Sequence, residues 1–157
     1  MNYSVGKPGR IFIVRLEENE DLLASLGSLA EREKIRSAVI LAIGNLKQGT
    51  LVCGARKQTL PVLPIRRKFD RNHEILGIGT LFRMAGKPKV HLHTALGRGR
   101  EVITGCLQEK SKVFLISELV VFELLGVRAI RERDDKTGFS LLEILQDDPR
   151  GIGPDAD

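Results

Sequence analysis

Two histidines and a cysteine are the residues of this chain whose types and spacing point most directly to chemistry. His91 and His93 stand two positions apart in the segment VHLHTALGRGREVITGCL, and Cys106 follows 13 positions after His93 (106 − 93). Two imidazoles and a thiolate form a ligand set that suits zinc or another first-row divalent metal. Three protein ligands also leave a fourth coordination position open, which is typical of a reactive or exchangeable metal.

The three side chains can meet only if this segment folds into a β-hairpin. Alternation along its first strand places His91 and His93 on one face. A two-residue turn at Arg98–Gly99 would set the register. His91 would then face Cys106 at a Cβ separation of about 5 Å, and Thr104 would face His93. The alternative is a plain hairpin, in which both histidines face solvent and the cysteine is merely buried; a slip of one residue would produce it.

His73 and Glu74 begin the segment HEILGIGTLF and add two further candidates. His73 is a potential fourth ligand near the metal. Glu74, on the opposite strand face, is a potential carboxylate that orients a ligand or lies in an interface. The competing interpretation makes His73 a surface histidine at a strand end and Glu74 a solvated carboxylate, and the sequence leaves both interpretations open.

The bulk composition is that of a one-domain globular chain. It has 157 residues, of which 42% are hydrophobic and 29% charged, enough for one proper core. No apolar run approaches the roughly 18 residues of a membrane span, and the N-terminus lacks the apolar stretch of a signal peptide. We expect a cytoplasmic protein without a disulfide framework. A single domain over 10–145 would lie between a flexible N-terminus (1–9) and a disordered C-terminal tail (146–157).

The rest of the sequence predicts an α+β fold, a mainly antiparallel sheet of about seven strands with few helices. One amphipathic helix is expected over 19–35, capped by Asn19, with Gly27 marking close packing. Close packing is also expected at Gly77 and Gly79. The expected strands are 10–18, 37–44, 50–55, 59–65, 73–82, 89–96, 100–108 and 112–124. The first two of them are expected to be buried on both faces.

Several blocks of the sequence together resemble the plants-and-prokaryotes conserved (PPC) domain family, in its stand-alone prokaryotic form. They are RIFIVRLEENEDLLASLGSLAEREKIRSAVILAIGNL, HEILGIGTL, KPKVHLHTALGRGREVITGCL and VFELLGVRAIRERDDKTGFSLLEI, in the family's order and spacing. The resemblance implies the PPC-domain fold, assembled as a homotrimer. It also implies a metal-capable site made by an H-x-H pair, matched by His91 and His93, and a later histidine. That later position falls on Cys106, a departure that still provides a zinc ligand.

The resemblance and the charge also indicate DNA as a partner. Prokaryotic members are described as predicted DNA-binding proteins, and this chain carries 25 basic and 20 acidic residues, a net charge of +5. A trimer would carry +15 (3 × 5), which favours binding to a polyanion. The candidate phosphate contacts lie in one charged loop (Arg66, Arg67, Lys68 and Arg71) and at the hairpin tip (Arg98 and Arg100).

Three functions are compatible with these features. The leading hypothesis is a non-enzymatic, weakly sequence-specific DNA-binding or regulatory module that carries the His-His-Cys zinc site. The alternative is a metal-dependent enzyme or small-molecule sensor, for which Glu74, Glu101 and Glu118 are the candidate general bases. The third is a trimeric interaction module that the metal only stiffens. No membrane partner is expected, and no phosphate loop or dinucleotide fingerprint occurs in the sequence.

Overall fold

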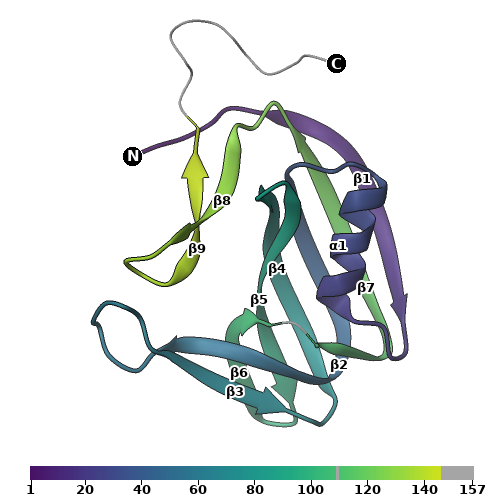
Figure 1. Cartoon of the computed structure of the whole chain (residues 1–157). Coiled ribbons are helices and arrows are strands. Elements are labelled where there is room, and N and C mark those ends of the chain that lie inside the picture. Colours follow the sequence, from purple (N-terminus) through teal and green to yellow (C-terminus); the bar gives the residue numbers. More distant parts are fainter. Residues whose placement is uncertain (109, 146–157) are drawn as a thin grey trace, which may run out of the picture.

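The computed structural model describes residues 1–108 and 110–145, and the predicted C-terminal tail (146–157) lies outside them (Figure 1). In the described part of the chain, nine strands form one sheet beside a single helix. The strands pair antiparallel, apart from one parallel contact between β4 and β8, so the predicted fold class is confirmed. The strands are β1 (Lys7–Glu17), β2 (Ala38–Ala55), β3 (Pro64–Phe69), β4 (His73–Met84), β5 (Lys87–Arg98), β6 (Glu101–Leu107), β7 (Lys112–Leu125), β8 (Ala129–Asp134) and β9 (Phe139–Ile144).

The helix α1 (Leu22–Arg32) is shorter than the sequence predicted. Its N-cap is Asp21, not Asn19, because the Asp21 carboxylate accepts a hydrogen bond from the Ala24 backbone N–H at 3.1 Å. The expected close packing at Gly27 is wrong, since a Cβ there would meet nothing within 4 Å. Leucines on one face of α1 nevertheless pack into the core, as their spacing predicted.

A single long strand, β2, replaces two of the expected strands. Gly44, with φ of 121°, lets the chain bend without ending the strand. The first half of β2 pairs with β7 and β4, and its second half pairs with β3 and β6. As a result β2, β4, β5 and β6 close into a ring of paired strands. Figure 1 shows β2 and β3 continuing together as a ribbon that projects from this ring.

The strand β3 begins at Pro64 and not at residue 59. Proline has no N–H to give to a strand ladder, so Pro61 interrupts the expected strand and Pro64 takes its first position, opposite Ala55. Arg66, Arg67 and Lys68 therefore lie on a strand, which corrects the expectation of a charged loop. Residues 7–9, expected in the flexible N-terminus, belong to β1.

One face of the sheet is buried and the other is open. The buried face carries Ile40 of β2, Leu92 of β5 and Leu119 of β7, which lie in one hydrophobic core with the apolar face of α1. The open face presents apolar side chains that are 37–77% exposed: Ile11, Ile13, Leu41, Ile43, Leu76, Ile78 and Phe122. The expectation that β1 and the first half of β2 are buried on both faces is therefore wrong for a single chain, since no described element covers the open face over these two strands.

Two further features position the candidate site. Gly77 and Gly79 of β4 are in close contact with β5, as predicted; a Cβ on Gly79 would lie 2.6 Å from the His91 carbonyl oxygen. The β8–β9 hairpin was not predicted, because four of the six residues of β8 are charged, and it meets β4 at Ile130. Within the described residues no helix is long and apolar enough to cross a membrane.

Candidate metal centre

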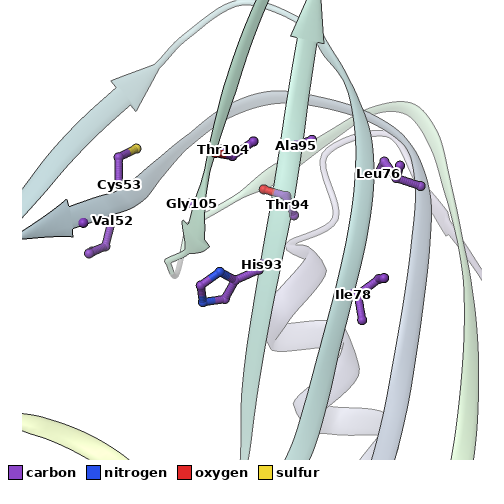
Figure 2. A pocket seen from close by; sticks show the side chains of 10 residues that line it. Val52, Cys53, Leu76, Ile78, His93, Thr94, Ala95, Thr104 and Gly105 are labelled. Atoms are coloured by element: carbon purple, nitrogen blue, oxygen red, sulfur yellow. The ribbon is translucent and has the colours of Figure 1, made fainter.

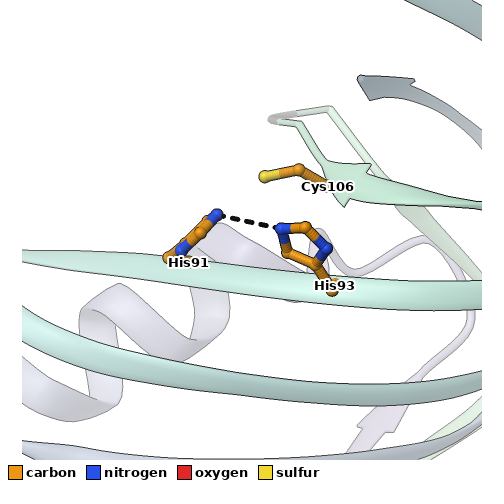
Figure 3. Close-up of side chains that lie close together, drawn as sticks. All are labelled: His91, His93 and Cys106. Atoms are coloured by element: carbon orange, nitrogen blue, oxygen red, sulfur yellow. Dashed lines mark hydrogen bonds between the residues drawn. The ribbon is translucent and has the colours of Figure 1, made fainter. Parts of the chain in front are cut away.

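His91, His93 and Cys106 converge on the open face of the sheet. One ligand atom from each of the three side chains lies within 4.8 Å of the other two. The two Nε2 atoms are 3.2 Å apart, and the imidazole rings meet edge to face at 83° (Figure 3). Two imidazole nitrogens and one sulfur gathered this closely form a donor set for a first-row divalent metal, and bonds of about 2.0–2.3 Å to one ion would draw the three atoms closer together.

The hairpin that carries these residues has a different register from the predicted one. Cys106 lies opposite His93 and not His91, and the turn residues are Gly99 and Arg100. Gly99, with φ of 63°, takes the first position of the turn. Paired positions therefore sum to 199 (93 + 106) instead of 197. Because this difference is two residues, every side chain keeps its predicted face.

The environment of the site favours uncharged histidine and a protonated thiol in the metal-free protein. Burial, followed by the charge of Arg131, lowers the pKa of His91 to about 4. Burial raises the pKa of the Cys106 thiol, and a hydrogen bond from Gln108 opposes that rise. A neutral imidazole is the form that binds metal, whereas the thiol must release its proton to solvent when the ion binds.

Two neighbours hold Cys106 in place. The Gln108 side-chain amide donates to the Cys106 sulfur at 3.4 Å and to the Cys106 carbonyl oxygen at 3.1 Å. Cys106 also pairs with Val52 of β2, on the side of β6 away from His93. The Cys106 backbone is thus held by pairing with β2 and β5, and its side chain is held by Gln108, as a ligand position requires.

Arg131 of β8 is a site residue that the sequence analysis missed. Its Nη2 donates to His91 Nδ1 at 3.1 Å and to the Thr80 hydroxyl at 3.2 Å, and Thr80 lies opposite His91 on β4. Burial lowers the pKa of Arg131. The alternation of Ala129 and Arg131 with Ile130 was the available signal, since it places the arginine on one face of a strand with a buried alanine.

His73 and Glu74 lie away from the three ligands. His73 stands five positions along β4 from Ile78 (78 − 73), the residue opposite His93, which corresponds to about 16 Å of strand. Its Nδ1 bonds with the Arg71 carbonyl oxygen at 2.6 Å. Glu74 shares the open face but is four positions from Ile78 (78 − 74), about 13 Å. The structure therefore brings neither residue to the metal ligands.

An open hollow of about 470 Å³ lies beside His93. Figure 2 shows His93 between Ile78 on one side and Val52 and Cys53 on the other. The walls of the hollow come from β2, β4, β5 and β6, the four strands of the ring. The ring thus forms a mostly apolar depression next to the exposed histidine.

The predicted DNA contacts are exposed but do not form one loop. Arg66, Arg67 and Lys68 lie on β3 of the projecting ribbon, and Arg71 follows that strand. Arg98 ends β5 and Arg100 lies in the turn before β6. Arg66 and Cys106 both pair with Val52, from opposite sides, so Arg66 lies two strands from the candidate ligand.

Comparison with known proteins assigns this arrangement to a family. A metal-containing protein from Archaeoglobus fulgidus has a similar structure, with a TM-score of 0.80 and 27% identity over 93% of this chain and 100% of that chain. A plant- and prokaryote-conserved protein from Pyrococcus horikoshii gives a TM-score of 0.81 and 28% identity over 93% and 99% of the two chains.

A third solved structure, a candidate DNA-binding protein from Ralstonia eutropha JMP134, shares the fold at 22% identity, with a TM-score of 0.71 over 85% and 90% of the chains. No curated protein matches the sequence. The model of the Plants and Prokaryotes Conserved (PCC) domain matches residues 3–125. Those residues contain the helix, the ring of strands and all three candidate ligands, and the chain therefore belongs to the Plants and Prokaryotes Conserved domain family.

Proposed function

We propose that this chain is a non-enzymatic, DNA-associated module that holds a divalent metal ion, zinc by its ligand set, through His91, His93 and Cys106. The observation that carries the proposal is the convergence of the three ligand atoms within 4.8 Å. The metal-containing Archaeoglobus fulgidus protein, which matches nearly the whole chain, supports it. An ion held by these residues, which lie on β5 and β6, would supply Lewis acidity there.

The absence of a nearby carboxylate favours a non-enzymatic role. Among the described residues, no aspartate or glutamate joins the three ligands. Glu101 lies at the hairpin tip opposite Arg98, and Glu118 lies opposite Ile43 of β2. A hydrolytic metal site needs a general base within hydrogen-bonding reach of its water. None of the candidate bases meets that condition.

DNA association is supported by the charge and its placement. The basic side chains of β3 and of the hairpin tip are exposed at the projecting parts of the molecule, where a duplex can reach them. The Ralstonia eutropha protein with this fold carries a DNA-binding description. Phosphate contacts from arginine and lysine give affinity without sequence information, so we expect weak sequence specificity.

The open face supports self-association, and the homotrimer is the stoichiometry that the family resemblance implies. Seven large apolar side chains gather on one sheet face, and an exposed apolar face of this kind is typical of an interface. A closed assembly of identical chains would cover the face in every copy. The free Cys53 and Cys106 suit a reducing compartment such as the cytoplasm.

Metal content measured by mass spectrometry tests the proposal. Tag-free protein is expected to carry close to one zinc ion per chain. The ion should be lost in His93→Ala and Cys106→Ser but retained in His73→Ala, which removes a histidine that lies away from the site. Wild-type protein that binds no zinc after reconstitution would refute the metal site.

The hollow beside His93 keeps the sensor alternative open. An exposed ligand next to an apolar depression can receive a small molecule at the fourth coordination position. Ligand-induced thermal shifts that require the metal would favour this alternative over the DNA-associated module.

A further inference from the structure

Arg131 is a buried cation that has no carboxylate partner among the described residues. The residue is 8% exposed, and within residues 1–108 and 110–145 its guanidinium donates to neutral groups: His91 Nδ1, the Thr80 hydroxyl and, at 3.1 Å, the Ser140 carbonyl oxygen. Its Nε is buried and has no hydrogen-bond partner among the described residues. A buried guanidinium without a counter-charge is energetically costly, so this arrangement needs a further partner.

The bond from Arg131 to His91 belongs to the metal-free state. Arginine can only donate, so His91 Nδ1 must accept, and the His91 proton then lies on the Nε2 that faces His93. An imidazole that binds metal through Nε2 carries its proton on Nδ1 and normally gives it to a carboxylate, a carbonyl or water. In this site the proton on His91 Nδ1 would point at the Arg131 guanidinium, which is also a hydrogen-bond donor. Arg131 must therefore change its partner when the site is loaded.

The charges of the loaded site do not balance. A divalent ion, one thiolate and Arg131 sum to +2 (2 − 1 + 1), and the other charged side chain that acts on His91 and Cys106 is a cation, Lys89. No acidic residue of the described chain belongs to the group. An anion from solution is the component that would complete it.

We infer that the site takes up its metal ion together with a small oxyanion, which binds at the open coordination position and accepts hydrogen bonds from Arg131. The guanidinium fork matches the two oxygens of a carboxylate or a tetrahedral oxyanion. The hollow beside His93 leaves room for a ligand larger than water. This inference rests on the proposed metal site and adds a ligand class to it.

Cobalt(II) titration followed by visible absorption and calorimetry tests the coupling. Tag-free protein is titrated in sodium perchlorate, and then with sodium acetate or sodium sulfate at matched ionic strength. Cobalt binding is expected to become about tenfold tighter with the preferred anion, a coupling typical of linked ligands. A stronger effect of acetate would identify a carboxylate as the ligand class, and a stronger effect of sulfate would identify a tetrahedral oxyanion.

Variants of two arginines on β8 separate a specific role from general electrostatics. Arg131→Gln should reduce the anion effect to less than about twofold, and Arg133→Gln, at an exposed position of the same strand, should leave it unchanged. Circular dichroism checks the fold of each variant. If Arg131→Gln does not fold, Arg131→Lys replaces it, because a lysine keeps the charge without the fork and should show a smaller anion effect.

The possible outcomes distinguish this inference from the proposed function. Cobalt that binds equally well in perchlorate, acetate and sulfate would overturn the coupled anion and leave the metal site standing. An anion effect that persists in Arg131→Gln would overturn the role of Arg131. Protein that binds no cobalt in any medium would overturn both the inference and the metal site.

Discussion

Gly105 of β6 lies against the backbone of Val52 of β2, so closely that a Cβ on Gly105 would stand 2.6 Å from the Val52 carbonyl oxygen. Real Cβ atoms do not approach an oxygen to that distance, so the contact requires glycine. Val52 also pairs with Cys106. The approach of β6 to β2 thus helps to set the position of a candidate metal ligand.

Gly105→Ala is expected to separate β6 from β2. Overpacking of this kind costs about 1–3 kcal/mol in the free energy of unfolding, and zinc binding should weaken because Cys106 moves. Urea denaturation and metal content measure the two effects. Gly97→Ala on the same hairpin is the control, since a Cβ there meets nothing within 4 Å. Equal stabilities of the two variants would contradict the expectation.

The Arg10–Glu123 pair predicts a loss of stability in acid. Arg10 Nε and Nη2 donate to the Glu123 carboxylate at 2.8 and 2.9 Å, and these bonds hold the pKa of Glu123 below its ordinary value against the opposing effect of burial. A carboxylate with a lowered pKa stabilises the fold above its unfolded pKa of about 4.3. That contribution disappears as the pH falls through the lower folded value.

Glu123→Gln should therefore be less stable than wild type at pH 7, and the difference should shrink toward pH 3. Urea midpoints measured across this pH range check the prediction. Glu132→Gln, at an exposed position of β8, should follow the wild-type curve. A Glu123→Gln variant that loses as much stability in acid as wild type would rule out the pair as the cause.

The open face predicts that a single charge can dissociate the assembly. Ile13 is 77% exposed in one chain, and Ile13→Glu would place a carboxylate in the interface at a desolvation cost of several kcal/mol. Sedimentation equilibrium should show a mass of three times 17.4 kDa for wild type and 17.4 kDa for the variant. Leu60→Glu changes an exposed leucine of the loop before β3 and should remain trimeric. A monomeric wild type would refute the trimer.

The basic strand β3 predicts salt-dependent DNA binding. Arg66→Gln with Lys68→Gln should weaken binding to random duplex DNA and lower the slope of log affinity against log salt by about two, roughly one for each phosphate that is no longer neutralised. Fluorescence anisotropy over a salt series measures both. The double variant Arg32→Gln with Arg36→Gln changes the same net charge elsewhere on the surface, at exposed positions, and should keep the wild-type slope. Equal slopes in both double variants would remove β3 as the DNA-binding strand.

Much of the fold and the faces of the candidate site could be predicted because they follow from local backbone geometry. Alternation along β5 placed His91 and His93 together on one face, and it is independent of where the turn falls. The turn itself was predicted one residue early, since both Arg98–Gly99 and Gly99–Arg100 contain a glycine that can adopt positive φ. The structure shows that Gly99 takes the first turn position.

What the sequence could not predict depends on contacts between distant segments. Arg131 reaches His91 only because β8 meets β4 at Ile130, a single pairing that no local pattern encodes. The exclusion of His73 from the site likewise depends on the register of β4 against β5, which places it opposite the hairpin tip. The expected strands 37–44 and 50–55 are parts of the single strand β2. Gly44, the last residue of the first expected strand, bends the chain there without ending the strand.

The three candidate ligands stand among the apolar side chains of the open face and not in a polar cleft. A neighbouring copy of the chain that covers this face would exclude water from around His93 and would lower the local dielectric constant at the site. Charges there would then attract and repel one another more strongly over the same distances. Assembly of the protein would thereby set the strength of its electrostatics, and a dissociated chain would offer the same three ligands to an ion in a more strongly screening medium.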